Sequence, residues 1–169
     1  MAANIDSIDN VDINDSIVTK RILAIAQGSE AKILVVDDDE MTLALISDLL
    51  QAGGFKVRRA TNGAEALRIL DKEWFPVILT DWQMPVMSGL ELTKRLRAKG
   101  VTDTYVIMLT ALESGLDYEQ AYEAGVDDYL TKKLPDIELF ARIHAAFCTL
   151  NLRRSLQEAR TALAGKTAS

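Results

Sequence analysis

The sequence predicts a doubly wound α/β sandwich, in which a five-stranded parallel sheet is covered by helices on both faces. From about residue 31 onward, short runs of aliphatic and β-branched residues alternate with longer amphipathic segments. The short runs are apolar throughout, as in strands that are buried on both faces, and do not alternate as in a one-sided antiparallel sheet. Strands joined by helices need right-handed crossovers, and these make neighbouring strands parallel.

The first half of the pattern contains two strands and two helices. A strand is expected at Ile33–Val36, because its aliphatic run stops abruptly at Asp37. An apolar helical stripe follows and ends near two adjacent glycines, which typically stop a helix. A second strand is expected over 56–61. An asparagine followed three residues later by a glutamate then forms a capping box, which opens a helix over 64–72.

The second half repeats the pattern and ends with a long helix. A second capping box, formed by a serine and a glutamate, precedes its first helix. The next helix is more polar and stops at a glycine. The expected elements are a strand over 77–80, a helix from Ser88 to about Lys99, a strand over 105–110, a helix over 113–124, a strand over 128–131 and a helix that starts near Asp136.

The chain of 169 residues has room for one domain with extra length at both ends. We expect an acidic N-terminal extension over 1–30, the domain over 31–150 and a C-terminal helical linker or dimerisation segment over 151–169. A short helix is predicted over 16–27, either as a docked accessory helix or as a frayed extension.

Composition excludes several classes of function. The formal net charge of −6 argues against direct binding of nucleic acid, which needs a basic surface. The single cysteine, Cys148, cannot form an internal disulfide, which fits a reducing compartment. No apolar run approaches the roughly 20 residues that span a bilayer, and aspartates interrupt the N-terminus where a signal peptide would be apolar. We therefore expect a cytoplasmic protein with no membrane partner.

Polar residues end the predicted strands at one edge of the sheet. They are Asp37 and Asp38 after the first strand, Asp81 after the third, Thr110 at the end of the fourth and Lys132 after the fifth. In sheets of this kind, ligands bind beyond the carboxyl ends of the strands, where the strand order reverses. We therefore expect three carboxylates, a hydroxyl and an ammonium group at one site.

Taken singly, each of these residues has a plainer explanation. An aspartate after a strand is often a turn residue or a helix cap, and a lysine in a loop is usually solvated. Together, three neighbouring carboxylates repel one another unless a cation neutralises them. Mg²⁺ suits the site, because this hard ion takes one or two protein carboxylates plus phosphate oxygens. With such an ion, one carboxylate can act as a nucleophile toward phosphorus.

Residues from Lys32 to about Leu150 resemble the receiver domain of bacterial two-component response regulators, whose fold is the flavodoxin-like three-layer sandwich. Each of the motifs that carry the resemblance follows one of the predicted strands or contains it. They are Ile33-Leu34-Val35-Val36-Asp37-Asp38, Asp81-Trp82-Gln83-Met84-Pro85-Val86-Met87-Ser88-Gly89, Met108-Leu109-Thr110-Ala111 and Ala124-Gly125-Val126-Asp127-Asp128-Tyr129-Leu130-Thr131-Lys132.

The resemblance implies a phosphoacceptor and a magnesium site. Asp81 matches the residue that accepts the phosphoryl group. Asp38 matches the direct metal ligand, and Asp37 matches the ligand that binds through water. The backbone carbonyl of Gln83 would complete the protein's share of the metal shell. A sensor histidine kinase or a phosphotransfer protein would be the phosphoryl donor.

The resemblance also implies a conformational switch. Lys132 would pair with the phosphoryl oxygens, and Thr110 would hydrogen-bond one of them. Tyr129 matches an aromatic residue that rotates inward after phosphorylation, so that protein contacts or dimerisation change. The domain would catalyse only its own phosphorylation and dephosphorylation, and would not be an enzyme acting on other substrates.

One position departs from the family pattern. The family usually has Lys-Pro after the fifth strand, with a cis peptide that aims the lysine, whereas this sequence has Lys132-Lys133 and its proline at Pro135. A cis bond before a residue other than proline costs about 3 kcal/mol. The bond is therefore either trans or strained, and Lys133 is an alternative to Lys132 in the site.

The last helix carries a second apolar pattern beyond the domain. Leu152, Leu156, Ala159 and Leu163 recur at 4-3-4 spacing. This short heptad pattern is either the seam of a coiled-coil homodimer or the apolar side of one helix that lies against the domain. The chain is either a single-domain regulator or a fragment of a longer protein, and the sequence slightly favours the fragment.

Two rival functions come from other classes. An aspartate-nucleophile phosphatase would need a second aspartate two residues after the nucleophile, where this sequence has Gln83. A receiver-fold interaction or dimerisation module that is not regulated by phosphorylation would be expected to lack at least one of the site residues, and all of them are present.

Overall fold

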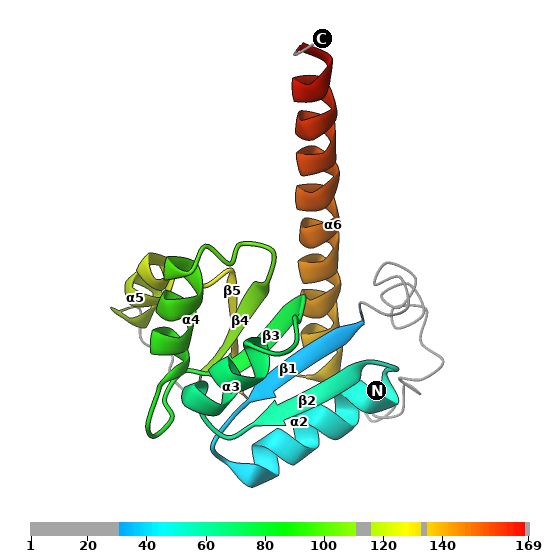
Figure 1. Cartoon of the computed structure of the whole chain (residues 1–169). Helices are drawn as coiled ribbons and strands as arrows, with labels where there is room; N and C mark the ends of the chain where they lie inside the picture. Colours follow the sequence, from blue (N-terminus) through cyan, green and yellow to red (C-terminus); the bar gives the residue numbers. More distant parts are fainter. Residues whose placement is uncertain (1–30, 111–115, 133–134, 168–169) are drawn as a thin grey trace, which may run out of the picture.

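The computed structural model describes residues 31–110, 116–132 and 135–167, apart from the side chains of 116–118 and 165–167. It contains a five-stranded sheet with the strand order β2-β1-β3-β4-β5, in which all four neighbouring pairs are parallel. The order reverses at β1, because the chain moves outward to β2 and then returns to β3 on the other side. The predicted doubly wound parallel sheet is confirmed (Figure 1).

The observed elements follow the predicted order. The strands are β1 (Lys32–Val36), β2 (Lys56–Ala60), β3 (Val77–Asp81), β4 (Tyr105–Thr110) and β5 (Asp128–Thr131). The helices are α2 (Glu40–Ala52), α3 (Gly63–Leu70), α4 (Gly89–Ala98), α5 (Leu116–Ala124) and α6 (Asp136–Thr167). The helix predicted over 16–27 lies outside the described residues.

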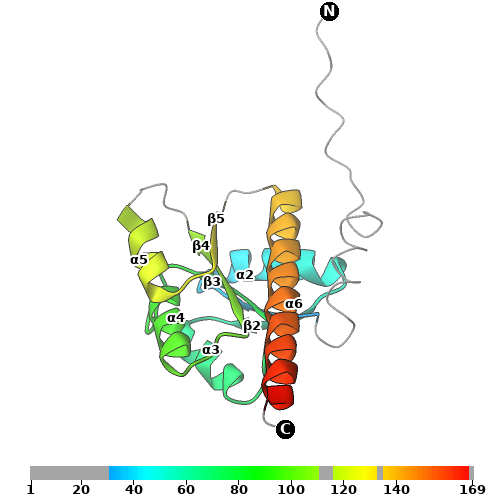
Figure 2. The same ribbon diagram turned by 90° about the horizontal axis from the view of Figure 1, so that it is seen from above.

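Helices cover both faces of the sheet (Figures 1 and 2). On one face, Leu43 and Leu50 of α2 and Phe140 of α6 share a buried cluster with Ile33 and Val35 of β1. On the other face, residues of α3 and α4 pack with the alternate residues of β1, Leu34 and Val36. The central strands β1, β3 and β4 therefore bury apolar side chains on both sides, which is why their apolar runs do not alternate. The edge strands β2 and β5 are more polar and partly exposed.

Side-chain caps start the helices where the sequence predicts them. The Asn62 side chain accepts a hydrogen bond from the Glu65 amide at 2.9 Å, and the Ser88 hydroxyl accepts one from the Glu91 amide at 3.2 Å. The Glu65 carboxylate reaches back to the amide of Thr61 at 2.8 Å. Both predicted N-caps are therefore present, but the glutamates do not complete the boxes, because Glu65 accepts from Thr61 and Glu91 pairs with Arg95 at 2.8 Å.

The last helix, α6, begins against the sheet and continues well beyond it (Figure 1). Phe140, Ile143 and Phe147 are buried in the core. Farther along, Leu152, Leu156 and Leu163 are 62%, 54% and 66% exposed. The apolar side of this extension therefore does not lie against the domain, and that alternative is wrong.

Two neighbouring aromatic side chains differ in burial. Trp74 is 37% exposed, whereas Phe75 is buried. Pro76 follows them, at a bend in the backbone just before β3.

None of the helices in the described part of the chain combines the length and the hydropathy that crossing a membrane requires.

Candidate functional site

Three carboxylates meet at the carboxyl edge of the sheet, where the strand order reverses. Asp37 and Asp38 follow β1, and Asp81 ends β3, the strand that pairs with β1. Each side chain offers an oxygen atom, and these three oxygens lie within 4.8 Å of one another. Asp37 is fully buried and Asp81 is 8% exposed, whereas Asp38 faces solvent.

Asp39, the third aspartate of the run, has a structural role. Its side chain caps α2 by accepting hydrogen bonds from the Met41 amide at 3.0 Å and the Thr42 hydroxyl at 2.9 Å. Its own amide donates to one oxygen of Asp37 at 2.9 Å, which orients the buried carboxylate. The run of three aspartates is thus divided between a helix cap and the acidic cluster.

Lys132 brings the ammonium group into this cluster from the end of β5. Its Nζ lies 2.8 Å from Oδ2 of Asp37 and 3.0 Å from Oδ2 of Asp81. Its backbone amide donates to the carbonyl of Thr110 at 2.9 Å, which ties the start of the following loop to the end of β4. Lys133, the alternative to Lys132, lies outside the described residues.

The electrostatics of the cluster show the cost of burying these charges. Burial raises the pKa of the Asp81 carboxyl above its ordinary value, although the Lys132 ammonium opposes the shift. Burial alone would lower the pKa of Lys132, but its contacts with Asp37 and Asp81 outweigh that effect and raise the pKa. The lysine is therefore held as a cation between two carboxylates.

One ammonium group does not balance three carboxylates, and among the described residues Lys132 pairs with Asp37 and Asp81 but not with Asp38. The buried Oδ2 of Asp37 lies 2.8 Å from the ammonium but has no well-aligned hydrogen bond among the described residues. Carboxylates gathered in this way repel one another, and burying them is energetically costly. The cluster therefore fits a hard cation, which prefers oxygen ligands and would offset the excess negative charge.

The loop after β3 is held in place by contacts that single-sequence reasoning did not identify. Met84 and Met87 are buried against the core, and the Met87 carbonyl accepts a hydrogen bond from the Gly63 amide at 3.0 Å. A Cβ at Gly89 would overlap the Asp81 carbonyl oxygen, so α4 can begin this close to the end of β3 only with glycine. Between these anchors, Val86 has a positive φ of 69° and is 87% exposed.

The remaining residues singled out in the sequence lie around the same edge. Thr110 ends β4 and is 5% exposed, and it follows Leu109, which pairs with Asp81. Gln83 lies in the loop two residues after Asp81, with an exposed side chain. Tyr129 is in β5, paired with Met108, and its side chain is 42% exposed. The edge therefore combines a buried acidic centre with an aromatic side chain at the surface.

Comparisons with known proteins agree with the fold. A model of the response regulator receiver domain matches residues 33–144. The transcriptional regulatory protein CpxR of Escherichia coli is 44% identical over 124 residues, which are 73% of this chain and 50% of CpxR. The sensory transduction protein RegX3 of Mycobacterium tuberculosis is 38% identical over 113 residues, which are 67% of this chain and 49% of RegX3.

A solved structure extends the similarity to three dimensions. The receiver domain of the Francisella response regulator 1452 is 35% identical with a TM-score of 0.66, and the match covers 70% of this chain and 97% of that chain. The chain spans about half the length of CpxR and RegX3. A parallel sheet with an acidic cluster at its carboxyl edge, together with these matches, leads to one conclusion. The chain belongs to the response regulator receiver family, a family of phosphorylation-regulated signalling domains.

Proposed function

We propose that Asp81 is the phosphoacceptor of this domain and that Lys132 and a magnesium ion assist the transfer. The observation that carries the proposal is the position of the Lys132 ammonium, 3.0 Å from one oxygen of Asp81 and 2.8 Å from Asp37. A lysine held there orients the acceptor and provides positive charge where phosphoryl oxygens would arrive. Positioning and charge neutralisation are the main requirements of phosphoryl transfer.

The metal would be held by Asp38 and Asp81 directly, by Asp37 through water and by the backbone carbonyl of Gln83. The three carboxylates already converge within 4.8 Å, and their negative charge exceeds that of the single lysine. Bound there, magnesium would neutralise phosphoryl oxygens and reduce the repulsion between them and the carboxylates. The exposed Asp38 leaves the site open to solvent, so the ion can enter without unfolding.

In the transfer, a lone pair on one Asp81 carboxylate oxygen attacks phosphorus. A new O–P bond forms as the P–N bond of a phosphohistidine breaks, and that bond's electron pair goes to the imidazole nitrogen of the donor. The contacts of Lys132 with Asp37 and Asp81 raise its pKa, which favours its ammonium form at the site before the transfer. Thr110, which follows Leu109, the β4 partner of Asp81, would then hydrogen-bond a phosphoryl oxygen, and Tyr129 would respond by turning inward.

The phosphoryl donor would be a sensor histidine kinase or a phosphotransfer protein, and the output a change of protein contacts. The formal net charge of −6 argues that this segment does not itself bind nucleic acid. We place the domain in the cytoplasm, as a signalling domain that catalyses only its own phosphorylation and dephosphorylation. If the longer protein has an output domain, that domain would respond to the change at the surface around Tyr129.

The test is the intact mass of the protein after incubation with magnesium and acetyl phosphate. The wild type should gain one phosphoryl group that base treatment removes, and Asp81→Asn should gain none. Omission of magnesium should also prevent the gain. Phosphorylation of Asp81→Asn to the wild-type level would overturn the assignment, and no gain in any sample would favour a receiver-fold interaction module.

Two lysine variants provide a matched comparison within this assay. Lys132→Ala should slow phosphorylation by about 100-fold, in line with the loss of one electrostatic group at a reacting centre. Lys133→Ala removes the same charge one residue later and should change the rate little. The opposite result would assign the role to Lys133.

A further inference from the structure

The part of α6 that leaves the domain presents an apolar stripe to solvent. Leu152 follows Leu150 by two residues, which at about 100° per residue places it about 200° around the helix. Leu156 likewise lies nine residues, or about 180°, from Phe147. Because Phe147 and Leu150 pack against the core, the leucines point away from the domain, consistent with their exposures of 62% and 54%.

The stripe extends back along the outer side of the domain itself. Thr149 lies three residues before Leu152, and Ala145 lies four residues before Thr149, so both continue the same spacing. Neither residue is buried. The outward face thus carries small residues beside the domain and large apolar residues beyond it. We call this face the outer seam, and it consists of Ala145, Thr149, Leu152, Leu156, Ala159 and Leu163.

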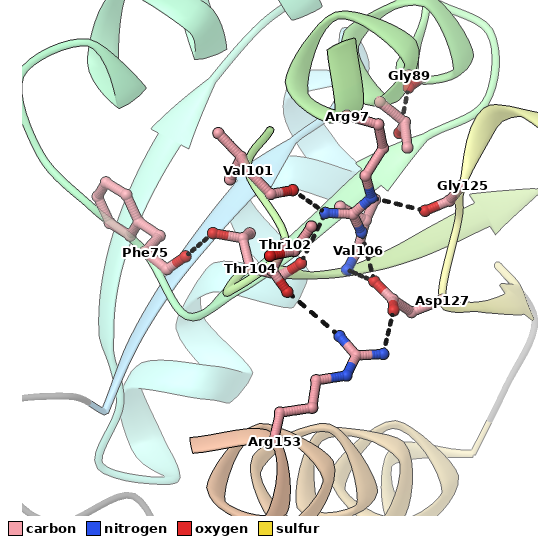
Figure 3. A network of polar contacts seen from close by, with 11 residues as sticks. Phe75, Gly89, Arg97, Val101, Thr102, Thr104, Val106, Gly125, Asp127 and Arg153 are labelled. Carbon is pink, nitrogen blue, oxygen red and sulfur yellow. Dashed lines mark hydrogen bonds and ion pairs between the residues drawn. The ribbon is translucent and has the colours of Figure 1, made fainter. Parts of the chain in front are cut away.

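A network of ion pairs fixes which way the seam faces (Figure 3). Arg153 donates to Oδ1 of Asp127 at 2.9 Å, and its guanidinium lies 5.8 Å from the centre of the Tyr105 ring. Oδ2 of Asp127 accepts from Arg97 at 2.6 Å and from the Val106 amide at 2.9 Å. The first turn of the extension is thereby attached to α4, β4 and the residue before β5, which sets its rotation about the helix axis.

We propose that the outer seam is the interface between two copies of this chain, paired as parallel helices. The 4-3-4 spacing of the exposed apolar positions is that of a two-stranded coiled coil. The seam lies opposite the domain on the helix, so two copies can pair along it with their domains on the outer sides. Pairing in this way needs no change in the receiver domain and goes beyond the phosphoryl chemistry of Asp81.

The charges beside the seam favour the parallel arrangement. Arg153 and Arg160 occupy equivalent flanking positions, seven residues apart. In an antiparallel pair, these flanking positions face each other, so that arginine would oppose arginine. In a parallel pair, they face the other flank, which is Ser155 and Ala162. Arg153 is also neutralised within its own chain by Asp127.

The expected affinity is low, because the seam is short. From Ala145 to Leu163 the helix rises about 27 Å, and two such helices bury less than the roughly 1,200 Å² of a standard interface. The dimer should therefore form reversibly, with a dissociation constant on the order of tens of micromolar. Sedimentation equilibrium over a dilution series of the full chain should show this monomer–dimer exchange.

Neighbouring residues provide the matched variants. Leu156→Glu places a charge in the seam and should abolish the dimer, whereas Gln157→Glu places the same charge on the domain side of the helix and should not. Asp81→Asn should still dimerise, which separates this interface from the phosphoacceptor assignment. A chain that remains monomeric at about ten times the expected dissociation constant, or equal effects of the two glutamates, would overturn the proposal.

Disulfide trapping tests the parallel register. In the Cys148→Ser background, Leu156→Cys should crosslink under mild oxidation at least about ten-fold faster than Gln157→Cys, because a disulfide needs Cα atoms within about 7 Å. Preferential crosslinking at Gln157→Cys would show a different interface. In a mixture of Leu156→Cys and Ala159→Cys chains, a preference for crosslinks between the two variants over crosslinks between identical chains would show antiparallel pairing. Each of these two results would contradict the proposal.

Discussion

Buried charges gather at both edges of the sheet, and the two clusters differ in how fully the protein compensates them. At the carboxyl edge, Asp37, Asp38 and Asp81 face one cation, Lys132, a formal excess of two negative charges. At the opposite edge, Asp127 is shared by two arginines, Arg97 and Arg153, a formal excess of one positive charge.

The hydrogen bonds show the same difference. Both oxygens of Asp127 accept hydrogen bonds, and Arg97 also donates to the carbonyls of Gly125, Val101 and Thr104 at 2.9, 2.7 and 3.1 Å. By contrast, Oδ2 of Asp37 has no well-aligned hydrogen bond among the described residues. A charge cluster that is satisfied within the protein stabilises the fold, whereas a cluster with unbalanced charge is suited to binding an ion or a substrate.

The largest effect should come from removing the centre of the satisfied cluster. Asp127→Ala leaves the Arg97 side chain, 20% exposed, without its counter-charge, and breaking a buried pair in this way costs about 3–5 kcal/mol of unfolding free energy. Chemical denaturation should show this loss with an unchanged dependence on denaturant. Asp71→Ala breaks an exposed pair with Lys99 and should cost less than about 1 kcal/mol. Equal losses in the two variants would contradict the comparison.

The unbalanced cluster should instead gain stability from a ligand. Magnesium at about 100 times its dissociation constant should raise the unfolding free energy by about 2.7 kcal/mol, because only the native state holds the three carboxylates together. Thermal unfolding with and without a chelator measures this gain. Asp38→Asn should lose most of it, and Asp71→Asn should retain it. An unchanged gain in Asp38→Asn would remove that residue from the metal site.

A smaller effect should appear when Asp81 can no longer ionise. Burial raises the pKa of Asp81 from its ordinary value of 3.8, so the native state resists its ionisation. The contribution of Asp81 to the stability of the wild type therefore falls as the pH rises from 3.8 to the raised pKa of the native state. Without magnesium at pH 7, Asp81→Asn should be more stable by on the order of 1 kcal/mol.

The pH dependence distinguishes this explanation from a general effect of the substitution. The advantage of Asp81→Asn should shrink as pH falls and vanish once Asp81 is protonated in both the native and the unfolded state. Unfolding measured across the acidic and neutral range, without metal, follows this change. An advantage that does not vary with pH would show that the charge of Asp81 is not its cause.

The smallest effect should come from the exposed part of the satisfied cluster. Arg153 is 46% exposed at the side chain, and Asp127 retains Arg97 when Arg153 is replaced. Arg153→Gln should therefore cost less than about 1 kcal/mol, and high salt should reduce that cost further. Denaturation at two ionic strengths measures both quantities. A loss as large as that of Asp127→Ala would mean that the extension is part of the folding core.

The order of the strands and helices could be predicted because its signals are local. Apolar runs, glycines and the helix N-caps at Asn62 and Ser88 each act within a few residues. The location of the acidic cluster could be predicted for a related reason: all strands of a parallel sheet end at the same edge. Strand direction brings Asp37, Asp38, Asp81 and Lys132 to that edge, although the three segments that carry them are far apart along the chain.

Other features were not predicted, because they depend on contacts between distant residues. The 4-3-4 spacing around Leu156 is the same whether the leucines face the domain or solvent. Only the placement of Phe147 against the sheet decides between the two. Arg97 and Asp127 are 30 residues apart and carry no common motif, so their ion pair is visible only in the folded chain.

The sequence by itself determined the type and order of the elements and the edge at which the reactive groups gather, because these follow from residue spacing and strand direction. The tertiary structure alone decided how the charges are shared. It shows Asp39 used as a helix cap, Lys132 reaching two carboxylates and Asp127 holding the first turn of the extension. The physical reason is that side-chain contacts depend on distances in space, which local patterns do not specify.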